Sequence, residues 1–310
     1  MDNIFQSDTF YEFLESLSFL EAFKVEVARD GVTKGRILGY IQKDGGRVKQ
    51  FFSRRAIVNG GPMLADDITE KEIGELLHKC VETLRHKAIY IEFRNYADYS
   101  EYREVFERCG FEYEPHYNFH IDTSNRENID KNMHKNPKRT IKASLAAGAE
   151  IVENPSKEEA MCWYEILRNL YSLKVHTPLF PKIFFVKAYE TNFIKPLLVR
   201  YQGEIIGGGL YVIGNNCVYE WFICGKDGEI NKVYPSTLGT YAGMCYAAEH
   251  KCERFDMMGA GSPNDGGYGV RDFKAKFGGE LVEHGRFRYV CNKTLYNMGV
   301  LAVKGMKSIK

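Results

Sequence analysis

The chain has 310 residues, enough for about two domains of ordinary size, and its 44% hydrophobic and 27% charged residues are typical of a globular protein with a full core. The net charge of +1 excludes a general attraction to nucleic acid or membranes, so any basic surface must be local, and we expect no binding to DNA. No apolar run approaches the roughly 20 residues that cross a bilayer, and the acidic, interrupted start of the chain is not typical of a signal peptide. We therefore expect a cytoplasmic protein with at most peripheral membrane contact.

The first half of the chain predicts a helix, three strands, a second helix and further strands. The opening helix covers 9–20, and β-rich runs follow at 23–29, 35–43 and 47–53. Thr69 caps a helix that extends to about residue 87, and Glu72 completes a capping box. A buried strand at 88–93, a helix that ends near Gly110 and a strand pair at 111–121 close this half.

The second half begins a new alternation of helices and strands. Asn136 as N-cap and Pro137 at the first helical position start a helix that stops before Gly148. Strands are predicted at 149–153, 196–201, 204–213, 217–224 and 254–258. Helices are predicted at 156–173 and 236–250, around Phe273, and in the tail at 294–310. A glycine-rich loop at 259–269 and a strand pair at 279–291 complete this half.

The two halves repeat one order of elements. Helix 69–87 with strand 88–93 corresponds to helix 236–250 with strand 254–258, and Phe106 corresponds to Phe273. We therefore predict an α/β protein of two tandem lobes, each a mixed sheet flanked by helices. The predicted lobes cover 1–124 and 125–292, and the tail, 293–310, packs back on the first lobe.

Lys274 marks an informative difference between the repeats, because the first repeat has Glu107 at the corresponding place. Glycine lets a backbone approach a ligand closely, and a lysine beside the loop at 259–269 could donate to the oxyanion that forms when an amine attacks a carbonyl. In this interpretation the ammonium reaches a wet cleft, and its loss leaves stability almost unchanged. The alternative is that Lys274 is an ordinary solvated helix lysine.

The eight cysteines form no C-x-x-C pair and the eight histidines form no H-E-x-x-H motif, so we expect reduced cysteines and no metal site. Glycines 207–209 lie inside a predicted strand, where they indicate a bulge or a close approach by a ligand.

Four segments, in order, resemble the Fem-type (FemAB) aminoacyltransferases: S-R-R-A-I-V-N-G-G-P at 53–62, K-N-P-K-R-T-I-K-A at 135–143 with the following G-A-E-I, F-D-M-M-G at 255–259 and F-K-A-K-F-G at 273–278. The resemblance implies two acetyltransferase-like (GNAT) lobes and transfer of an amino acid from aminoacyl-tRNA to a peptidoglycan precursor. It also implies that Lys274 is at the catalytic centre, with Tyr234 in the cleft and Asp256 at the end of a core strand, and these two are the other catalytic candidates, which would shape the cleft or relay a proton. Phe273 and Arg271, beside Lys274, are then expected to contact substrate.

Two departures from the family pattern concern the acceptor. Residues 16–24 lack the Q-x-x-x-W…K pattern whose lysine helps to hold the precursor's phosphates. Phe180 stands where some members carry a phosphate-binding arginine, and its loop is more similar to that of relatives linked to exopolysaccharide synthesis. The acceptor is therefore left open, with Phe180 as a candidate contact.

The residues that could bind phosphate indicate which donor the protein uses. Ordinary GNAT enzymes bind the pyrophosphate of acetyl-CoA on a Q/R-x-x-G-x-G/A turn, of which residues 233–239 keep one glycine and no leading basic residue. Basic residues instead gather at 126–147, where Lys138, Arg139 and Lys142 are candidates to bind tRNA phosphates, unless they form an ordinary solvated helix face. Arg54 and Arg55 alternate on a strand, so one of them is expected to face substrate.

We therefore predict an acyltransferase, most simply one that moves an aminoacyl group from aminoacyl-tRNA to an amine of a cell-envelope, peptidoglycan-like precursor. One alternative is a CoA-dependent N-acyltransferase that acts on an amino sugar or polysaccharide precursor. The other is a degenerate, non-catalytic protein that binds such precursors. No cofactor is implied beyond the donor, which is either aminoacyl-tRNA or an acyl-CoA.

Overall fold

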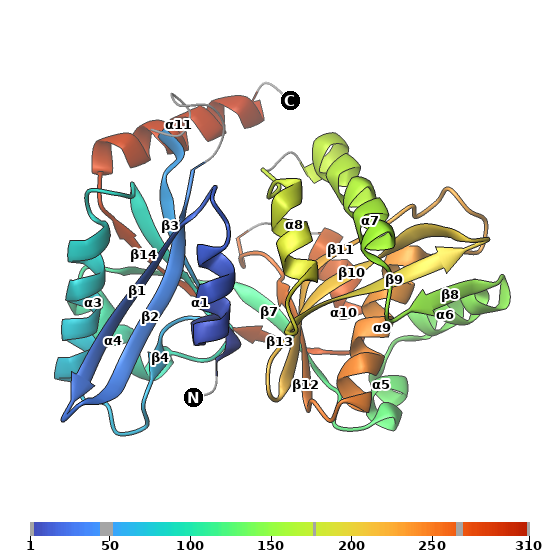
Figure 1. Cartoon of the computed structure of the whole chain (residues 1–310), viewed down its shortest axis with the longest axis horizontal. Helices are drawn as coiled ribbons and strands as arrows, with labels where there is room; N and C mark the ends of the chain where they lie inside the picture. Colours follow the sequence, from blue (N-terminus) through green and yellow to red (C-terminus); the bar gives the residue numbers. More distant parts are fainter. Residues whose placement is uncertain (1–2, 44–51, 176–177, 265–268, 309–310) are drawn as a thin grey trace. The chain divides into compact units, whose positions relative to one another are not determined.

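The computed structural model describes residues 3–43, 52–175, 178–264 and 269–308 of the chain (Figure 1). These residues form two compact units, one of Met1–His116 with Glu283–Lys310 and one of Tyr117–Val282. None of the described helices is both long and apolar enough to cross a membrane.

The first unit is built of one sheet and helices on either side of it. Its strands are β1 (Glu21–Arg29), β2 (Val32–Gln42), β3 (Arg55–Asn59), β4 (Met63–Leu64), β5 (Tyr90–Arg94), β6 (Glu112–Glu114) and β14 (Arg286–Val290). Its helices are η1 (Ile4–Gln6), α1 (Asp8–Glu15), α3 (Glu70–Leu84), η2 (Ser100–Tyr102), α4 (Arg103–Arg108) and α11 (Lys293–Ser308). The strands lie in the order β1-β2-β3-β5-β14-β6, and β4 pairs with β2.

One face of this sheet packs on α3 and α4 and forms the core of the first unit (Figure 1). The predicted capping box of Thr69 and Glu72 starts α3, and Phe106 of α4 stacks on Phe287 of β14 with 4.1 Å between ring centroids. Because successive strand residues point to opposite faces, the other face receives the alternate residues of β5 and β14, and these are largely charged.

The second unit is also a sheet between helices. Its strands are β7 (Tyr117–Asp122), β8 (Ala149–Val152), β9 (Ile194–Tyr201), β10 (Glu204–Ile213), β11 (Cys217–Gly225), β12 (Arg254–Gly259) and β13 (Glu280–Glu283). Its helices are α5 (Arg126–Asn132), α6 (Lys135–Ala146), α7 (Lys157–Leu170), the π-helical turn η3 (Tyr171–Val175), α8 (Lys182–Tyr189), α9 (Pro235–Glu249) and α10 (Gly269–Ala275). The strand order is β13-β7-β12-β11-β10-β9-β8.

Helix α9 lies directly on β10 and β11, and α7 and α8 lie on the other side of the sheet (Figure 1). The glycine run at 207–209 makes this close packing possible, because a side chain at Gly207 would stand 2.7 Å from Pro235 of α9. Gly208 has φ +130 beside a bulge between Ile205 and Gly207, and its carbonyl accepts a hydrogen bond from Trp163 (2.9 Å). The predicted bulge is confirmed, and the close approach is made by a helix of the chain itself.

The two units share one topology, as the repeat in the sequence predicts. In each, antiparallel strands lead to a parallel pair joined by a helix: β3 and β5 with α3, and β11 and β12 with α9. Phe106 and Phe273 lie on the equivalent helices α4 and α10 that follow. The repeat therefore describes the architecture of both units.

The unit boundaries differ from the predicted 124 and 292 because the units exchange strands. β7 follows the first unit in the chain but pairs with β12, and β14 follows the second unit but pairs with β5 and β6. The strand pairs predicted at 111–121 and 279–291 are thus each divided between two sheets. In the tail, Tyr296 of α11 contacts the ring of Tyr90 of β5 edge-on, 5.6 Å between centroids.

The predicted strand at 47–53 lies mostly outside the described residues, since 44–51 are not among them. The third described strand is β3, whose apolar run Ala56, Ile57 and Val58 is fully buried. Helix α6 begins at Lys135 with His134 as N-cap, so Asn136 is inside the first turn, where its side chain accepts from Arg139 (3.2 Å). Helices α5 and α8 were not expected from the sequence.

Candidate active site

Lys274 lies on α10 with its ammonium inside the second unit. Its side chain is almost fully buried, and Nζ donates to the carbonyl of Met257 and to that of Gly259 (2.9 Å), both on β12. The expectation of a wet cleft around this ammonium is therefore wrong. An ammonium has three N–H donors, so the two carbonyls leave one donor for another acceptor.

The F-K-A-K-F-G segment holds Lys274 in place. Phe277 is buried and packs edge-on against Phe273, with 5.2 Å between ring centroids. Gly278 has φ +81, and a side chain there would overlap the backbone of Asn132 at the end of α5. The aromatic anchor and the glycine therefore fix the turn after α10 against the α5–α6 segment.

Asp256 supports the β12 carbonyls that accept hydrogen bonds from Lys274. Its fully buried carboxylate accepts from the backbone of Met258 (2.6 Å) and from Asn118 (3.3 Å), and lies 3.2 Å from Nε2 of His120. Met258 has φ +57, which is uncommon for a residue with a side chain, and the β12–β7 register shifts at this point. Asp256 thus stabilises the bulge that presents the Met257 and Gly259 carbonyls to Lys274.

Glu220 of β11 belongs to the same cluster and was missed by the sequence interpretation. Burial raises the pKa of Glu220 to about 7, although the charge of Lys274 and the hydroxyl of Thr240 oppose the shift. In turn, burial lowers the pKa of Lys274, and the charges of Glu220 and Asp256 oppose that change. The available signal was a lone carboxylate in the otherwise apolar run at 217–224.

The cluster lies where two strands separate. β11 and β12 pair in parallel only through Cys217–Arg254, Val218–Phe255 and Tyr219–Asp256, although both strands continue further. Glu220 and Met257 are the first residues past this ladder. The opening between parallel strands is therefore where the free donor of Lys274 and the carboxyl of Glu220 are brought together.

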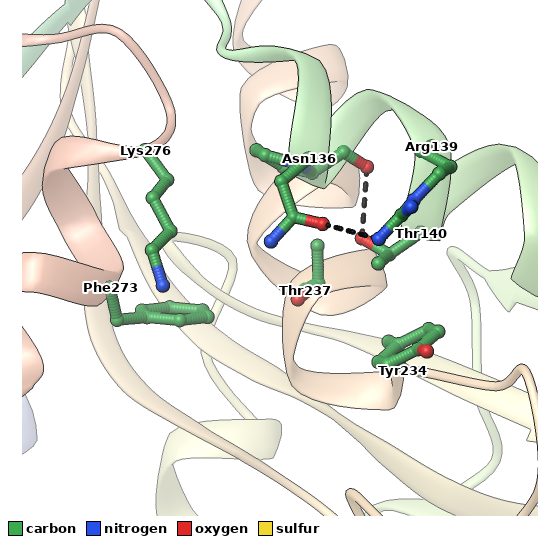
Figure 2. A pocket seen from close by; sticks show the side chains of 8 residues that line it. Asn136, Arg139, Thr140, Tyr234, Thr237, Phe273 and Lys276 are labelled. Carbon is green, nitrogen blue, oxygen red and sulfur yellow. Dashed lines mark hydrogen bonds between the residues drawn. The ribbon is translucent and has the colours of Figure 1, made fainter.

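A pocket of about 290 Å³ on the second unit collects other predicted site residues (Figure 2). It is lined by Asn136, Pro137, Arg139, Thr140, Tyr234, Thr237, Phe273 and Lys276. Figure 2 shows Phe273 and Lys276 on one side, with Asn136 and Arg139 across from them. The lining combines two cations and two aromatic rings with no carboxylate, a combination that suits a nucleotide or another aromatic phosphate compound.

The basic residues of α6 divide between two surfaces. Lys138 and Lys142 line a wider hollow of about 520 Å³ with Tyr241, whereas Arg139 lines the pocket of Figure 2. All three side chains are exposed. Arg126 of the same basic region is paired with Glu249 (3.0 Å). The patch predicted at 126–147 is therefore not one continuous surface.

The remaining predicted residues have identifiable contacts. Arg271 donates to the carbonyls of Ala260 (2.9 Å) and Ser262, and its guanidinium lies over the ring of Tyr117. These contacts fix the start of the loop after β12. Residues 265–268 of that loop lie outside the described residues. Phe180 stacks on Phe184 (4.3 Å) in an aromatic cluster at α8; its neighbours 176–177 are likewise outside the described residues.

Arg54 and Arg55 belong to the first unit, both half-buried. Arg55 begins β3 and is paired in register with Tyr90, on the charged face of that sheet. Neither arginine is part of the Lys274 cluster, which lies within the second unit.

The N-terminus of α9 carries an intrachain carboxylate. Asp227 accepts hydrogen bonds from the backbone and the hydroxyl of Ser236, in the first turn of the helix. Free N–H groups at this position are what a pyrophosphate requires, and a carboxylate both occupies them and repels an anion. Among the described residues, no group of three or more His, Cys, Asp or Glu side chains could hold a metal ion.

Comparison with known proteins gives a consistent result. Residues 188–304, which include Lys274, match the FemAB family, while no curated protein matches the chain. The crystal structure of FemX has a TM-score of 0.72 at 14% identity, covering 96% of this chain and 94% of that one. The structure of L-PGS from Bacillus licheniformis has a TM-score of 0.61 at 14% identity, covering 95% and 91%.

A third structure supports the two-lobed fold. The tandem GNAT protein from the clavulanic acid biosynthesis pathway has a TM-score of 0.55 at 12% identity, covering 88% of this chain and 84% of that one. The predicted lobes, each a mixed sheet flanked by helices, are confirmed by these likenesses and by the shared topology of the two units. The later part of the chain, residues 188–304, is therefore similar to the FemAB family, and the chain as a whole has the fold of two tandem GNAT-like lobes.

Proposed function

We propose that this protein is an acyltransferase that moves an aminoacyl group from aminoacyl-tRNA to an amine of a cell-envelope precursor. The observation that carries the proposal is the placement of Lys274. The segment that matches the FemAB family holds its ammonium at the separation of β11 and β12, with two N–H donors bound and one left over. The likeness to FemX over nearly the whole chain supports the same reaction class.

The chemistry assigned to Lys274 is stabilisation of an oxyanion. The acceptor amine attacks the carbonyl carbon of the aminoacyl ester, and the carbonyl electrons move to oxygen. The third N–H of Lys274 donates to that oxygen in a site with little water, where such a bond is strong. Collapse of the intermediate reforms the carbonyl and breaks the ester bond, the ribose oxygen leaves and takes a proton, and the new amide nitrogen loses one.

Asp256 and Glu220 act on this donor as positioning residues. Asp256 maintains the bulge that orients Lys274 through two carbonyls, and Glu220 supplies the opposing charge that favours the protonated amine. We assign the pocket of Figure 2 to the terminal nucleotide of the donor, with Tyr234 and Phe273 as stacking surfaces and Arg139 and Lys276 at phosphate.

The alternative donor, acyl-CoA, is disfavoured by Asp227. In that reaction the pyrophosphate would need the N-terminal N–H groups of α9, where Asp227 already accepts from Ser236. A non-catalytic role is disfavoured because a buried ammonium with an unused donor is costly to maintain in a protein that only binds ligand.

The test is a binding and transfer assay with tRNA charged through a stable amide, uncharged tRNA and acetyl-CoA. We expect charged tRNA to bind, acetyl-CoA not to compete, and Tyr234→Ala to weaken tRNA binding. Transfer from normally charged tRNA to a nucleotide-linked peptidoglycan precursor should be lost in Lys274→Met, while tRNA binding remains. Tight acetyl-CoA binding without tRNA binding would show that the donor assignment is wrong.

A further inference from the structure

The charged face of the first unit's sheet contains more arginine than its own carboxylates can neutralise. Four arginines (Arg55, Arg94, Arg286 and Arg288) accompany three glutamates (Glu92, Glu112 and Glu114) on the described strands β3, β5, β14 and β6 of this face, which we call the arginine face. None of these residues belongs to the Lys274 cluster or to the pocket of Figure 2.

Arg94 of β5 and Arg286 of β14 stand directly opposite each other in the antiparallel ladder. Like charges in such a cross-strand pair are destabilising, so the pair needs a compensating anion. Glu92 supplies part of it: its carboxylate accepts from Nε of Arg94 (2.8 Å) and from Arg288 (2.8 Å), and lies 3.4 Å from Arg286.

One carboxylate does not satisfy three guanidinium groups. Burial would raise the pKa of Glu92, but the charges of Arg94 and Arg286 hold it far below its ordinary value. The pKa of Arg286 is lowered by burial, with the neighbouring Arg94 and Arg288 adding to the effect and Glu92 opposing it. The charged form of Arg286 is therefore disfavoured mainly by its burial, which a bound anion would offset.

The arginines differ in their exposure and in how many of their N–H groups already form hydrogen bonds. Arg288 also donates to Glu114 and to the hydroxyl of Tyr296 (2.8 Å), and its side chain is only 17% exposed. Arg94 is 34% exposed, and among the described residues only its Nε has a hydrogen bond. Arg286 is 26% exposed, and besides its contact with Glu92 its Nη2 lies 2.9 Å from Nε2 of His116. Both arginines are partly exposed, and each keeps N–H groups beyond these contacts, since a guanidinium carries five N–H donors.

We propose that Arg94 and Arg286 bind an oxyanion of the acceptor, a phosphate or a carboxylate, on the arginine face of the first unit. Planar guanidinium forks bind such groups through two parallel hydrogen bonds, and a second arginine across the ladder adds a further pair. The inference rests on the proposed transfer to an anionic envelope precursor.

Binding can be tested without the transfer reaction. Titration calorimetry of the full chain with pyrophosphate and, separately, with succinate distinguishes phosphate from carboxylate as the preferred group. We expect one of these probes to bind and its dissociation constant to rise at least tenfold in Arg94→Gln and in Arg286→Gln. Arg94→Lys keeps the positive charge but loses the planar guanidinium fork, so its dissociation constant should lie between those of the wild type and Arg94→Gln. Arg108→Gln, an exposed change on α4 of the same unit, is the matched control.

The midpoint of thermal unfolding distinguishes a role of the two arginines in binding from a role in stability. Since Arg94 and Arg286 repel each other, either single variant should keep a midpoint near that of the wild type. Unchanged binding in both variants, or no binding of either probe to the wild-type chain, would overturn the proposal. Lys274→Met should bind the probe normally, so a failure of the transfer assay alone would count against the proposed function and not against this site.

Discussion

Lys274 on α10 and Glu220 on β11 lie in one buried cluster at the point where β11 and β12 stop pairing, and each changes the pKa of the other. The ammonium is held by two backbone carbonyls, and the carboxyl is fully enclosed. The proposed catalytic role and the stability of the second unit therefore involve the same residues, so variants of this cluster test both.

Lys274→Met should lower transfer by about 100- to 1000-fold, because loss of one oxyanion donor typically has that effect. It should also destabilise the protein by about 1–3 kcal/mol, since two buried carbonyls lose their donor. Turnover and urea unfolding of the same preparation check both expectations. Lys157→Met, an exposed exchange on α7, is the control. Full transfer activity in Lys274→Met would remove Lys274 from the mechanism.

Glu220→Gln should change how stability depends on pH. A folded-state pKa of about 7, raised above the unfolded value, means that Glu220 contributes stability below the unfolded pKa and loses it as pH rises to 7. The unfolding free energy of Glu220→Gln relative to wild type should therefore increase between pH 5 and pH 8, by on the order of 3 kcal/mol. A difference that is constant with pH, measured by denaturant unfolding, would contradict the raised pKa.

The two faces of α6 should contribute separately to donor binding. Replacing Lys138 and Lys142 together by Ala should reduce the steepness of the salt dependence of tRNA binding. The slope of log K, the tRNA association constant, against log salt should become less negative by about 1.4–1.8, since each phosphate contact contributes about 0.7–0.9. Arg139→Ala acts in the other pocket and should add its own, smaller change. Identical salt slopes for the wild type and the double variant would argue against phosphate contacts on this face.

Gly278→Ala should destabilise the second unit strongly, by about 3 kcal/mol or more, because the new side chain meets the Asn132 backbone at a left-handed φ of +81. Gly203→Ala separates the two effects, since Gly203 has φ +84 and nothing within 4 Å. That variant should cost only about 1–2 kcal/mol. Thermal unfolding measures both, and equal losses would mean that the overlap with Asn132 is relieved by small shifts.

The sequence alone determined the order of the elements and the repeat, because both depend on local patterns. The capping box of Thr69 and Glu72, the apolar strand at 88–93 and the F-K-A-K-F-G segment each contain their own signal within a few residues. The candidate lysine is therefore recognisable from the sequence without any tertiary contact. The strand β3 at Arg55–Asn59 was not predicted, because the pattern of the sequence placed a strand at 47–53, most of which lies outside the described residues.

Only the tertiary structure decided which strands pair and which charges are buried. β7 and β14 join the sheets of the opposite halves because long-range hydrogen bonding, which no local pattern encodes, determines strand partners. For the same reason the sequence could not show that Lys274 is enclosed beside Glu220 or that Arg94 stands opposite Arg286. Each of these pairs joins residues more than fifty positions apart, and the energy of a charge depends on the neighbours that the fold places around it.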